Sequence, residues 1–202
     1  MVLFRARSSR GWMAQTPEMR RCILISMVGA LLLLSGCTGR PDNIKPVSPF
    51  DINRYQGVWY EIMRLDHSFE RGLTNVTATY ILRGDGMVDV LNKGFDRKRC
   101  RWKEALGIAS FQGKKTVASL SVTFFWPFAG GYHVFALDTE DYGHALVAGP
   151  SQNYLWILAR QPGLSLETRN DLVSKARQHG FSVKDLILVD HSAELCSKKY
   201  KP

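Results

Sequence analysis

The chain has 202 residues, of which 45% are hydrophobic, and carries a formal net charge of +9. This length suits one or two small domains, and the hydrophobic fraction is that of an ordinary globular protein rather than a disordered one. Residues 1–36 carry five Arg and one Glu, which leaves a net charge of about +5 for the rest of the chain.

An almost unbroken apolar run extends from Cys22 to Leu34. This run is too short for a membrane-spanning helix, which needs roughly 20 residues, but it suits the core of a signal peptide. Arg20 and Arg21 precede it, as expected of the charged region of such a peptide. We therefore predict a signal peptide over residues 1–36, in which residues 1–18 are an upstream extension if translation starts at Met19.

The apolar run ends in Leu34-Ser35-Gly36-Cys37, which is typical of a bacterial lipobox. The thiol of Cys37 would take the diacylglyceryl group, and two or three chains of the palmitate class hold a protein at a membrane for practical purposes irreversibly. The alternatives are a plain secretory signal with an incidental Cys, or a buried core helix. Thr38 follows where Asp would favour the inner membrane, so we predict an anchor in the outer membrane, on its periplasmic side.

Much of the remaining positive charge lies between Lys93 and Lys103. The exported compartment argues against a nucleic-acid partner. A solvated loop is one interpretation of this stretch, and contact with anionic lipid head groups is the other.

Two cysteines remain once Cys22 leaves with the signal and Cys37 is acylated. Cys100 and Cys196 would then meet in an oxidising compartment, and neither has the spacing of a metal ligand. We predict a disulfide between them, with two free buried thiols as the alternative.

Residues 37–50 contain three prolines and little periodicity, and we predict a lipidated tether there. Residues 51–202 are predicted to form one domain. It contains eight runs of strand composition separated by turn signals, at residues 57–65, 76–82, 87–95, 102–111, 117–125, 131–137, 144–149 and 154–160. This spacing predicts an antiparallel meander, and eight strands suffice for a barrel that holds one small ligand.

The periodicity changes after the last of these runs. Ser165 is a predicted N-cap, Leu172 and Ala176 belong to an apolar stripe at helical spacing, and Gly180 is a predicted C-terminal stop. We expect this helix to pack outside the barrel, followed by a short returning strand at residues 187–189.

Several segments in the same order resemble the lipocalins, and among them the bacterial outer-membrane lipoprotein lipocalins of the Blc type. Gly57-Val58-Trp59-Tyr60-Glu61 is similar to the G-x-W-Y-E signature of the first strand, and Tyr154-Leu155-Trp156-Ile157-Leu158-Ala159-Arg160 to the last strand with its family arginine. The resemblance runs from about Phe50 to Val189. It implies an all-β fold, an eight-stranded antiparallel up-and-down lipocalin barrel with a C-terminal α-helix packed outside.

The motif residues Gly57, Trp59 and Arg160 are interpreted as structural. Trp59 can close one end of the barrel, and the Arg160 guanidinium can lie over its indole face, a contact worth roughly 0.5–2 kcal/mol.

Strand alternation then predicts which side chains face the cavity. If Trp59 and Arg160 point inward, so do their alternate neighbours on the first and last strands. Leu120, Val122 and Phe124 are the better candidates for the inner face of the fifth strand. The predicted ligand-binding residues are Trp156, Tyr132, Met63, Glu61, Tyr154, Leu158 and Val134, with core packing as the alternative for each.

The resemblance implies a binder of fatty acids or lysophospholipids that serves envelope lipid storage, transport or repair, and it allows a homodimer. The chain has no G-x-S-x-G, H-E-x-x-H, C-x-x-C or phosphate loop, so we predict no enzyme, no cofactor and no metal site. Two alternatives remain open: a structural or assembly lipoprotein with a filled barrel, and a binder of haem or another apolar molecule.

Overall fold

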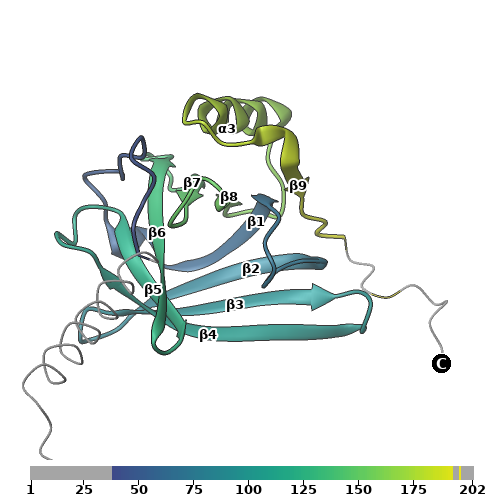
Figure 1. Ribbon diagram of the computed structural model, residues 1–202, viewed down its shortest axis with the longest axis horizontal. Coiled ribbons are helices and arrows are strands. Elements are labelled where there is room, and N and C mark those ends of the chain that lie inside the picture. The colour runs from purple at the N-terminus through teal and green to yellow at the C-terminus, as the bar shows by residue number, and fades with distance from the viewer. Residues whose placement is uncertain (1–37, 193–195, 197–202) are drawn as a thin grey trace, which may run out of the picture. The chain divides into compact units, whose positions relative to one another are not determined.

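The computed structural model describes residues 38–192 and Cys196; the predicted signal peptide and Cys37 lie outside this range. Its described part is built on a β-sheet that closes into a barrel (Figure 1). The eight barrel strands are β1 (Gly57–Leu65), β2 (Leu73–Leu82), β3 (Val88–Asp96), β4 (Arg101–Phe111), β5 (Ser119–Phe125), β6 (Phe128–Leu137), β7 (His144–Ala148) and β8 (Leu155–Ala159).

Each strand pairs antiparallel with the next along the chain, and β1 closes the barrel by pairing with both β2 and β8. A ninth strand, β9 (Leu186–Leu188), pairs with the far end of β1. Because the strands run alternately up and down, the turns that follow β1, β3, β5 and β7 share one end of the barrel. The predicted eight-stranded antiparallel up-and-down barrel is confirmed.

Two apolar clusters lie on either side of the barrel wall. The inner cluster gathers side chains from all eight strands and includes Trp59, Val90 and Val134. The outer cluster includes Ile62, Leu155 and other side chains that alternate with the inward ones, and it is covered by helix α3 (Leu166–Gln178). β7 and β8 are therefore buried on both faces, which explains their nearly continuous apolar sequences.

Helix α3 begins and ends as predicted. The Ser165 hydroxyl caps it by accepting from the Thr168 amide at 3.1 Å. Leu172 and Ala176 are buried against the barrel, and Gly180 follows with a φ of +78°, a conformation that glycine adopts at little cost. A short 3₁₀ helix, η1 (Val183–Asp185), leads into β9.

The described part of the predicted tether packs on the barrel. Ile44 and Phe50 are buried, and Val47 exchanges main-chain hydrogen bonds with the carbonyl of Val134 and the amide of Ala118, at 2.8 and 3.0 Å. A short helix, α2 (Ile52–Tyr55), follows and crosses the barrel end where Trp59 lies. Residues 38–50 thus form an ordered strap against β5 and β6.

The predicted inward orientation of Met63 is wrong. The pairing of β1 with β8 shifts between Glu61 and Met63, which is the mark of a β-bulge. Beyond the bulge, Ile62 and Met63 pack in the outer cluster, and Arg64 lies buried beside Glu61. A similar shift between Val134 and Ala136 turns Ala136 to the outer cluster.

The predicted disulfide between Cys100 and Cys196 is confirmed, with Cα atoms 5.9 Å apart. It joins the turn between β3 and β4 to the C-terminal segment. Arg97, in the same turn, also pairs with Asp190 at 2.5 Å.

Candidate functional site

The closed end of the barrel is sealed by stacked rings and a cation. Trp59 is fully buried, and the guanidinium carbon of Arg160 lies 4.0 Å from its ring centroid. The indole Nε1 donates to the carbonyl of Tyr55 at 2.8 Å, which ties α2 to the floor. Gly57 has a φ of +90°, so its place at the start of β1 suits glycine and few other residues.

Three tyrosines form a hydrogen-bonded group just above this floor. The hydroxyl of Tyr132 lies 2.7 Å from that of Tyr55 and 2.8 Å from that of Tyr80. Burial raises the pKa of all three phenols, so they are neutral at physiological pH. Each hydroxyl finds a partner in the group, which allows three polar side chains to line an apolar interior.

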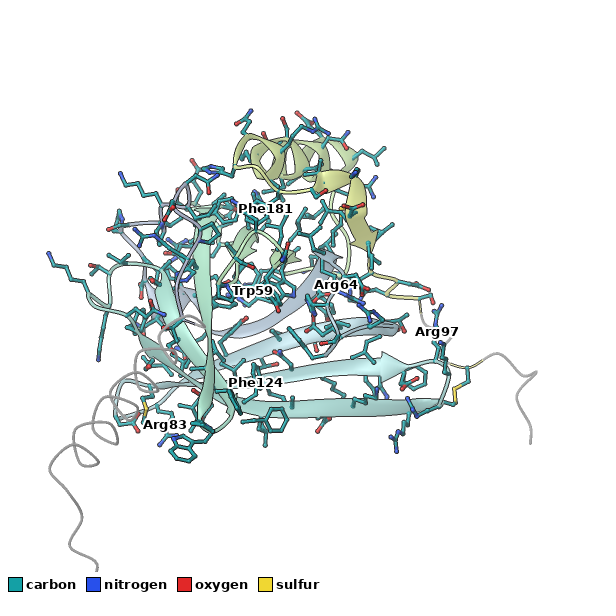
Figure 2. The ribbon with its side chains drawn as sticks, viewed as in Figure 1. Trp59, Arg64, Arg83, Arg97, Phe124 and Phe181 are labelled. Atoms are coloured by element: carbon teal, nitrogen blue, oxygen red, sulfur yellow. A yellow bond between two sulfur atoms is a disulfide. The ribbon has the colours of Figure 1, made fainter. Side chains whose placement is uncertain are left out.

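The wall above the tyrosines is made of small side chains on β4 and larger ones on β5. Ala109 and Gly107 fall on the same side of β4, and Ala109 lies in the inner cluster. A Cβ at Gly107 would lie 2.8 Å from the Phe124 ring, so only glycine leaves room for that ring here. The missing side chain at Gly107 on β4 therefore makes space for the ring of Phe124 on β5, which Figure 2 labels.

Solvent reaches several aromatic side chains that point inward. Phe124, Tyr132 and Trp156 pack against the inner cluster but are only partly buried, as is Ala78 on β2. Apolar side chains on the inner face of a filled barrel would be fully buried. The partial exposure indicates an interior that is open toward one end.

A buried charged cluster lines the wall formed by β1, β8 and the β1–β2 loop, near the open end. Arg64 donates to the Glu61 carboxylate at 2.6 Å and to the carbonyl of Glu70 at 3.0 Å. The indole Nε1 of Trp156 donates to the Glu70 carboxylate at 3.1 Å. Two acidic groups, one guanidinium and one indole thus converge inside the barrel.

Burial sets the protonation of this cluster. It raises the pKa of Glu61 well above its usual range, and the negative charge of Glu70 raises it further, while Arg64 opposes both effects. Burial also raises the pKa of Glu70, against the hydrogen bond from Trp156. Since one guanidinium faces two carboxyls, one of the two keeps its proton to a higher pH than an exposed carboxyl would.

His67 completes the cluster on the β1–β2 loop. Its ring lies 5.1 Å from that of Trp156 and 5.9 Å from that of Tyr154. Burial and the nearby Arg64 lower the pKa of His67 to about 4. The ring lies 3.2 Å from the Glu70 carboxyl without hydrogen-bond geometry, and that carboxyl tends to be protonated, so the contact does not hold a proton on the imidazole.

Some buried polar atoms of the cluster have no hydrogen-bond partner within the described residues. They are Nε of Arg64 and both ring nitrogens of His67. An unmatched buried polar group costs about 1–3 kcal/mol, so these atoms are available to a polar group that enters the barrel.

The structure brings together most of the predicted ligand-binding residues. Their side chains line the inner face, the charged cluster or the mouth; these are Trp156, Tyr132, Glu61, Tyr154, Leu158 and Val134. Met63 is excluded by the bulge. Sequence reasoning missed Arg64, His67 and Glu70, because the bulge hides the first and the other two lie in a loop without periodicity.

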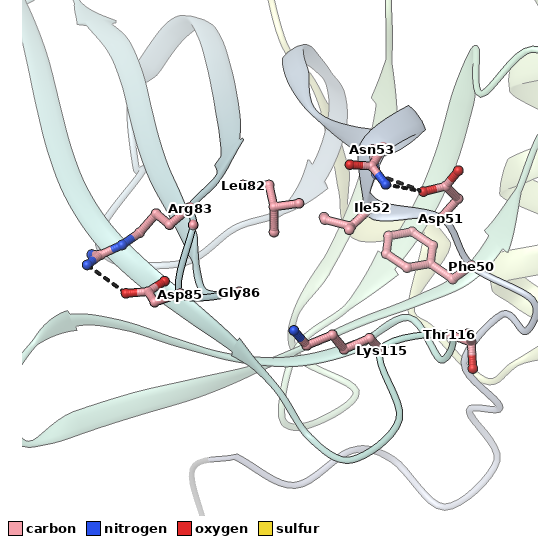
Figure 3. A pocket seen from close by; sticks show the side chains of 11 residues that line it. Phe50, Asp51, Ile52, Asn53, Leu82, Arg83, Asp85, Gly86, Lys115 and Thr116 are labelled. Carbon is pink, nitrogen blue, oxygen red and sulfur yellow. Dashed lines mark hydrogen bonds and ion pairs between the residues drawn. The ribbon is translucent and has the colours of Figure 1, made fainter.

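A separate surface hollow of about 480 Å³ lies between α2 and the β2–β3 turn, at the closed end (Figure 3). Two of its charged side chains pair with one another, since Arg83 lies 2.9 Å from Asp85, and Arg83 also lies 3.4 Å from Asp89 outside the hollow. We do not assign a ligand to this hollow.

Across residues 38–192 and Cys196, no group of three or more His, Cys, Asp or Glu side chains is placed to hold a metal ion. None of the helices in this described part is long and apolar enough to cross a membrane.

A closed antiparallel barrel with a stacked Trp–Arg floor and inward aromatic side chains that solvent partly reaches is typical of a lipocalin. The protein-family model described as the lipocalin-like domain matches residues 50–191 of the chain. The chain belongs to the lipocalin family, whose members are binding proteins.

Among its relatives, the outer membrane lipoprotein Blc of Vibrio cholerae is 46% identical over 165 residues, which cover 82% of this chain and 96% of that protein. The outer membrane lipoprotein Blc of Escherichia coli K12 is 47% identical, over 85% of this chain and 97% of that protein. These relatives confirm the predicted outer-membrane localisation and the resemblance to this lipoprotein group.

More distant comparisons agree on the fold. Temperature-induced lipocalin-1 of Arabidopsis thaliana is 34% identical over 69% of this chain and 78% of that protein. The structure of insecticyanin from Manduca sexta superimposes with a TM-score of 0.63 at 22% identity, over 81% of this chain and 92% of that one.

Proposed function

We propose that the protein is anchored at Cys37 in the outer membrane and holds a fatty acid or lysophospholipid in its barrel. The observation that carries the proposal is the partial exposure of Trp156, Tyr132 and Phe124 on the inner face. An acyl chain of such a lipid would bury this surface, and each methylene that leaves water contributes about 0.8 kcal/mol.

The polar groups near the open end suit the head group of an amphipathic lipid. Arg64, with its unmatched Nε, stands on one wall. Strand alternation puts Arg101 and Lys103 on the inner side of β4 at its open end, where Lys103 pairs with Asp96 at 3.0 Å. A phosphate or carboxylate at this level would meet cations from two walls while its acyl chain lies deeper in the barrel.

This arrangement favours a lipid role in the envelope over a structural one. A lipoprotein with a filled barrel would have no use for unmatched polar atoms beside a partly exposed indole. Storage, transport or repair of envelope lipids each requires that one acyl chain enters and leaves reversibly.

Fluorescence titration of the delipidated mature protein tests the proposal. Adding lysophospholipid or fatty acid should quench or shift the emission of Trp156, and the change should disappear in Trp156→Phe. Trp102→Phe is the matched control, since this indole lies on β4 facing outward, partly exposed, and the response should survive its loss.

Calorimetry distinguishes a lipid-binding barrel from a filled, structural one. The Trp156→Ala variant should bind the lipid about tenfold more weakly, as expected for the loss of one aromatic contact. If the folded wild type binds none of several lipids, or if Trp156→Ala lowers only the stability, the barrel is a filled structural element and the proposal fails.

A further inference from the structure

The turn between β5 and β6 exposes an unusual amount of apolar surface. We call residues 125–128 the aromatic tip. Within it, Phe125 is 76% exposed, Trp126 89% and Phe128 67%. On the neighbouring strand β4, Leu106 is 74% exposed, two residues before the pair of Ile108 with Thr123 on β5. Clustered apolar side chains of this size mark an interaction site more often than an ordinary surface.

The aromatic tip belongs to the open end of the barrel. In the up-and-down topology, the turns after β1, β3, β5 and β7 lie opposite the end that α2 and Trp59 close. In Figure 1 the β5–β6 turn points away from α3. The β1–β2 loop at this end exposes a further aromatic side chain, Phe69.

The described chain begins beside β6, the strand that follows the aromatic tip. The carbonyl of Thr38 accepts from Gln112 at 2.8 Å, and that of Gly39 lies 2.9 Å from Nε2 of His133 on β6. A Cβ at Gly131 would collide with the Gly39 carbonyl, so the strap runs directly over this part of β6. Gly131 lies three positions after Phe128, a distance of about 10 Å along a strand.

Basic side chains accompany the apolar ones at the open end. The β3–β4 turn and the start of β4 expose Lys98, Arg99 and Arg101. Aromatic side chains that enter the head-group region, on a protein whose same end carries cations that attract anionic head groups, form the pattern of a surface that binds membranes. A second copy of the chain docked tip to tip would instead bring these like charges together.

We propose that the aromatic tip inserts into the leaflet that holds the lipid anchor, so that the barrel opens onto the membrane. The inference rests on the lipidation of Cys37 proposed above. With the anchored residue at the level of the head groups, the tip lies within reach of the acyl chains. A lipid can then pass between leaflet and barrel without crossing water.

Brominated phospholipids test the insertion independently of ligand binding. The mature lipoprotein is reconstituted into vesicles of phosphatidylethanolamine and phosphatidylglycerol, with bromines on the acyl chains. Wild type should lose a share of its tryptophan emission that Trp126→Phe does not lose. Equal quenching of the two proteins would mean that Trp126 stays in water, and the proposal would be overturned.

Lipid transfer tests the consequence. The Phe125→Ser/Trp126→Ser/Phe128→Ser variant should pass a fluorescent fatty acid between its own vesicle and the barrel about tenfold more slowly, as expected when a buried aromatic contact with the membrane is lost. Its affinity for the fatty acid in solution should be unchanged. Leu166→Ser on α3 is the matched control, because its side chain is as exposed as that of Phe128.

Three results would overturn the proposal. The first is unchanged transfer by the triple variant. The second is the absence of bromine quenching of Trp126 together with a dimer on sedimentation that the triple variant does not form, since a second copy would then cover the tip. The third is equal slowing by Leu166→Ser. If no protein binds fatty acid in solution, the function proposed for the barrel fails, whereas the quenching result still decides the insertion.

Discussion

The guanidinium of Arg160, which follows β8, contacts three other segments at the closed end of the barrel. Besides stacking on Trp59, it donates to the carbonyls of Val58, Arg54 and Tyr142, at 2.9, 2.8 and 3.3 Å. These acceptors lie in β1, in α2 and in the turn before β7. A planar group with several fixed donors suits this place, and an ammonium, with one compact charge, does not.

Arg160→Lys should therefore lower the free energy of unfolding by about 2 kcal/mol, through lost hydrogen bonds and a weaker stack. Urea unfolding of wild type and variant measures the difference. Arg71→Lys is the control, since its pair with Asp66 is solvent-exposed, and such pairs contribute roughly 0–1 kcal/mol. Equal losses in the two variants would show that Arg160 acts as an ordinary surface charge.

His67 gives the stability a pH dependence of defined sign. Its pKa in the folded protein, about 4, lies below the ordinary value of 6.5. Between these pH values the unfolded chain binds more protons than the folded one. The stability that a neutral His67 contributes is therefore fully present above about pH 6.5 and is lost as the pH falls toward 4.

Relative to His67→Phe, the wild-type protein should thus lose about 2 kcal/mol of unfolding free energy as the pH falls from neutral to 4. This figure allows for the solvent near the ring. The raised pKa values of Glu61 and Glu70 have the opposite effect, since the stability that these carboxyls contribute is lost as the pH rises. Only the comparison of wild type with His67→Phe therefore isolates the contribution of the histidine. Proton NMR of the ring should give a midpoint near 4. A midpoint close to 6.5 would contradict the prediction.

At the scale of elements, alternation and turn residues predicted nearly all of the barrel. The runs at residues 57–65 and 102–111 match β1 and β4 to within one residue. Ser165 and Gly180 marked the helix correctly, because capping is a local property. The stacking of Arg160 on Trp59 also followed from a resemblance that the structure bears out.

The bulges could not be predicted, and the errors at the site follow from them. A bulge needs two residues of one strand opposite one of its partner, so it depends on pairing rather than on local sequence. In β1 it turns Met63 outward and buries Arg64, which reads as a surface charge in the sequence. The packing of the strap at residues 38–50 could not be predicted either. It depends on pairing with Ala118 and Val134, which lie far along the chain, and leaves no periodic pattern in the local sequence.

For the whole molecule, the disulfide links the C-terminal segment covalently to the open end. Cys100 and Cys196 close a loop with a sequence separation of 96 residues. The chain-entropy model gives about 4–5 kcal/mol for a loop of this length. Part of that gain is already provided by other contacts, since Val189 donates to the Ile62 carbonyl at 3.0 Å and Asn75 to that of Asp190 at 2.8 Å.

Replacing both cysteines by serine should therefore lower the free energy of unfolding by about 3 kcal/mol, less than the loop length alone implies. Denaturant unfolding measures the loss, and wild type treated with reductant should unfold at the same midpoint as the variant. The bridge lies at the mouth rather than among the ligand-facing side chains, so the folded variant should bind lipid with unchanged affinity. A loss of affinity in the folded variant would show that the β3–β4 turn must be held in place for the barrel to receive its ligand, and the bridge would then belong to the binding site as well as to the fold.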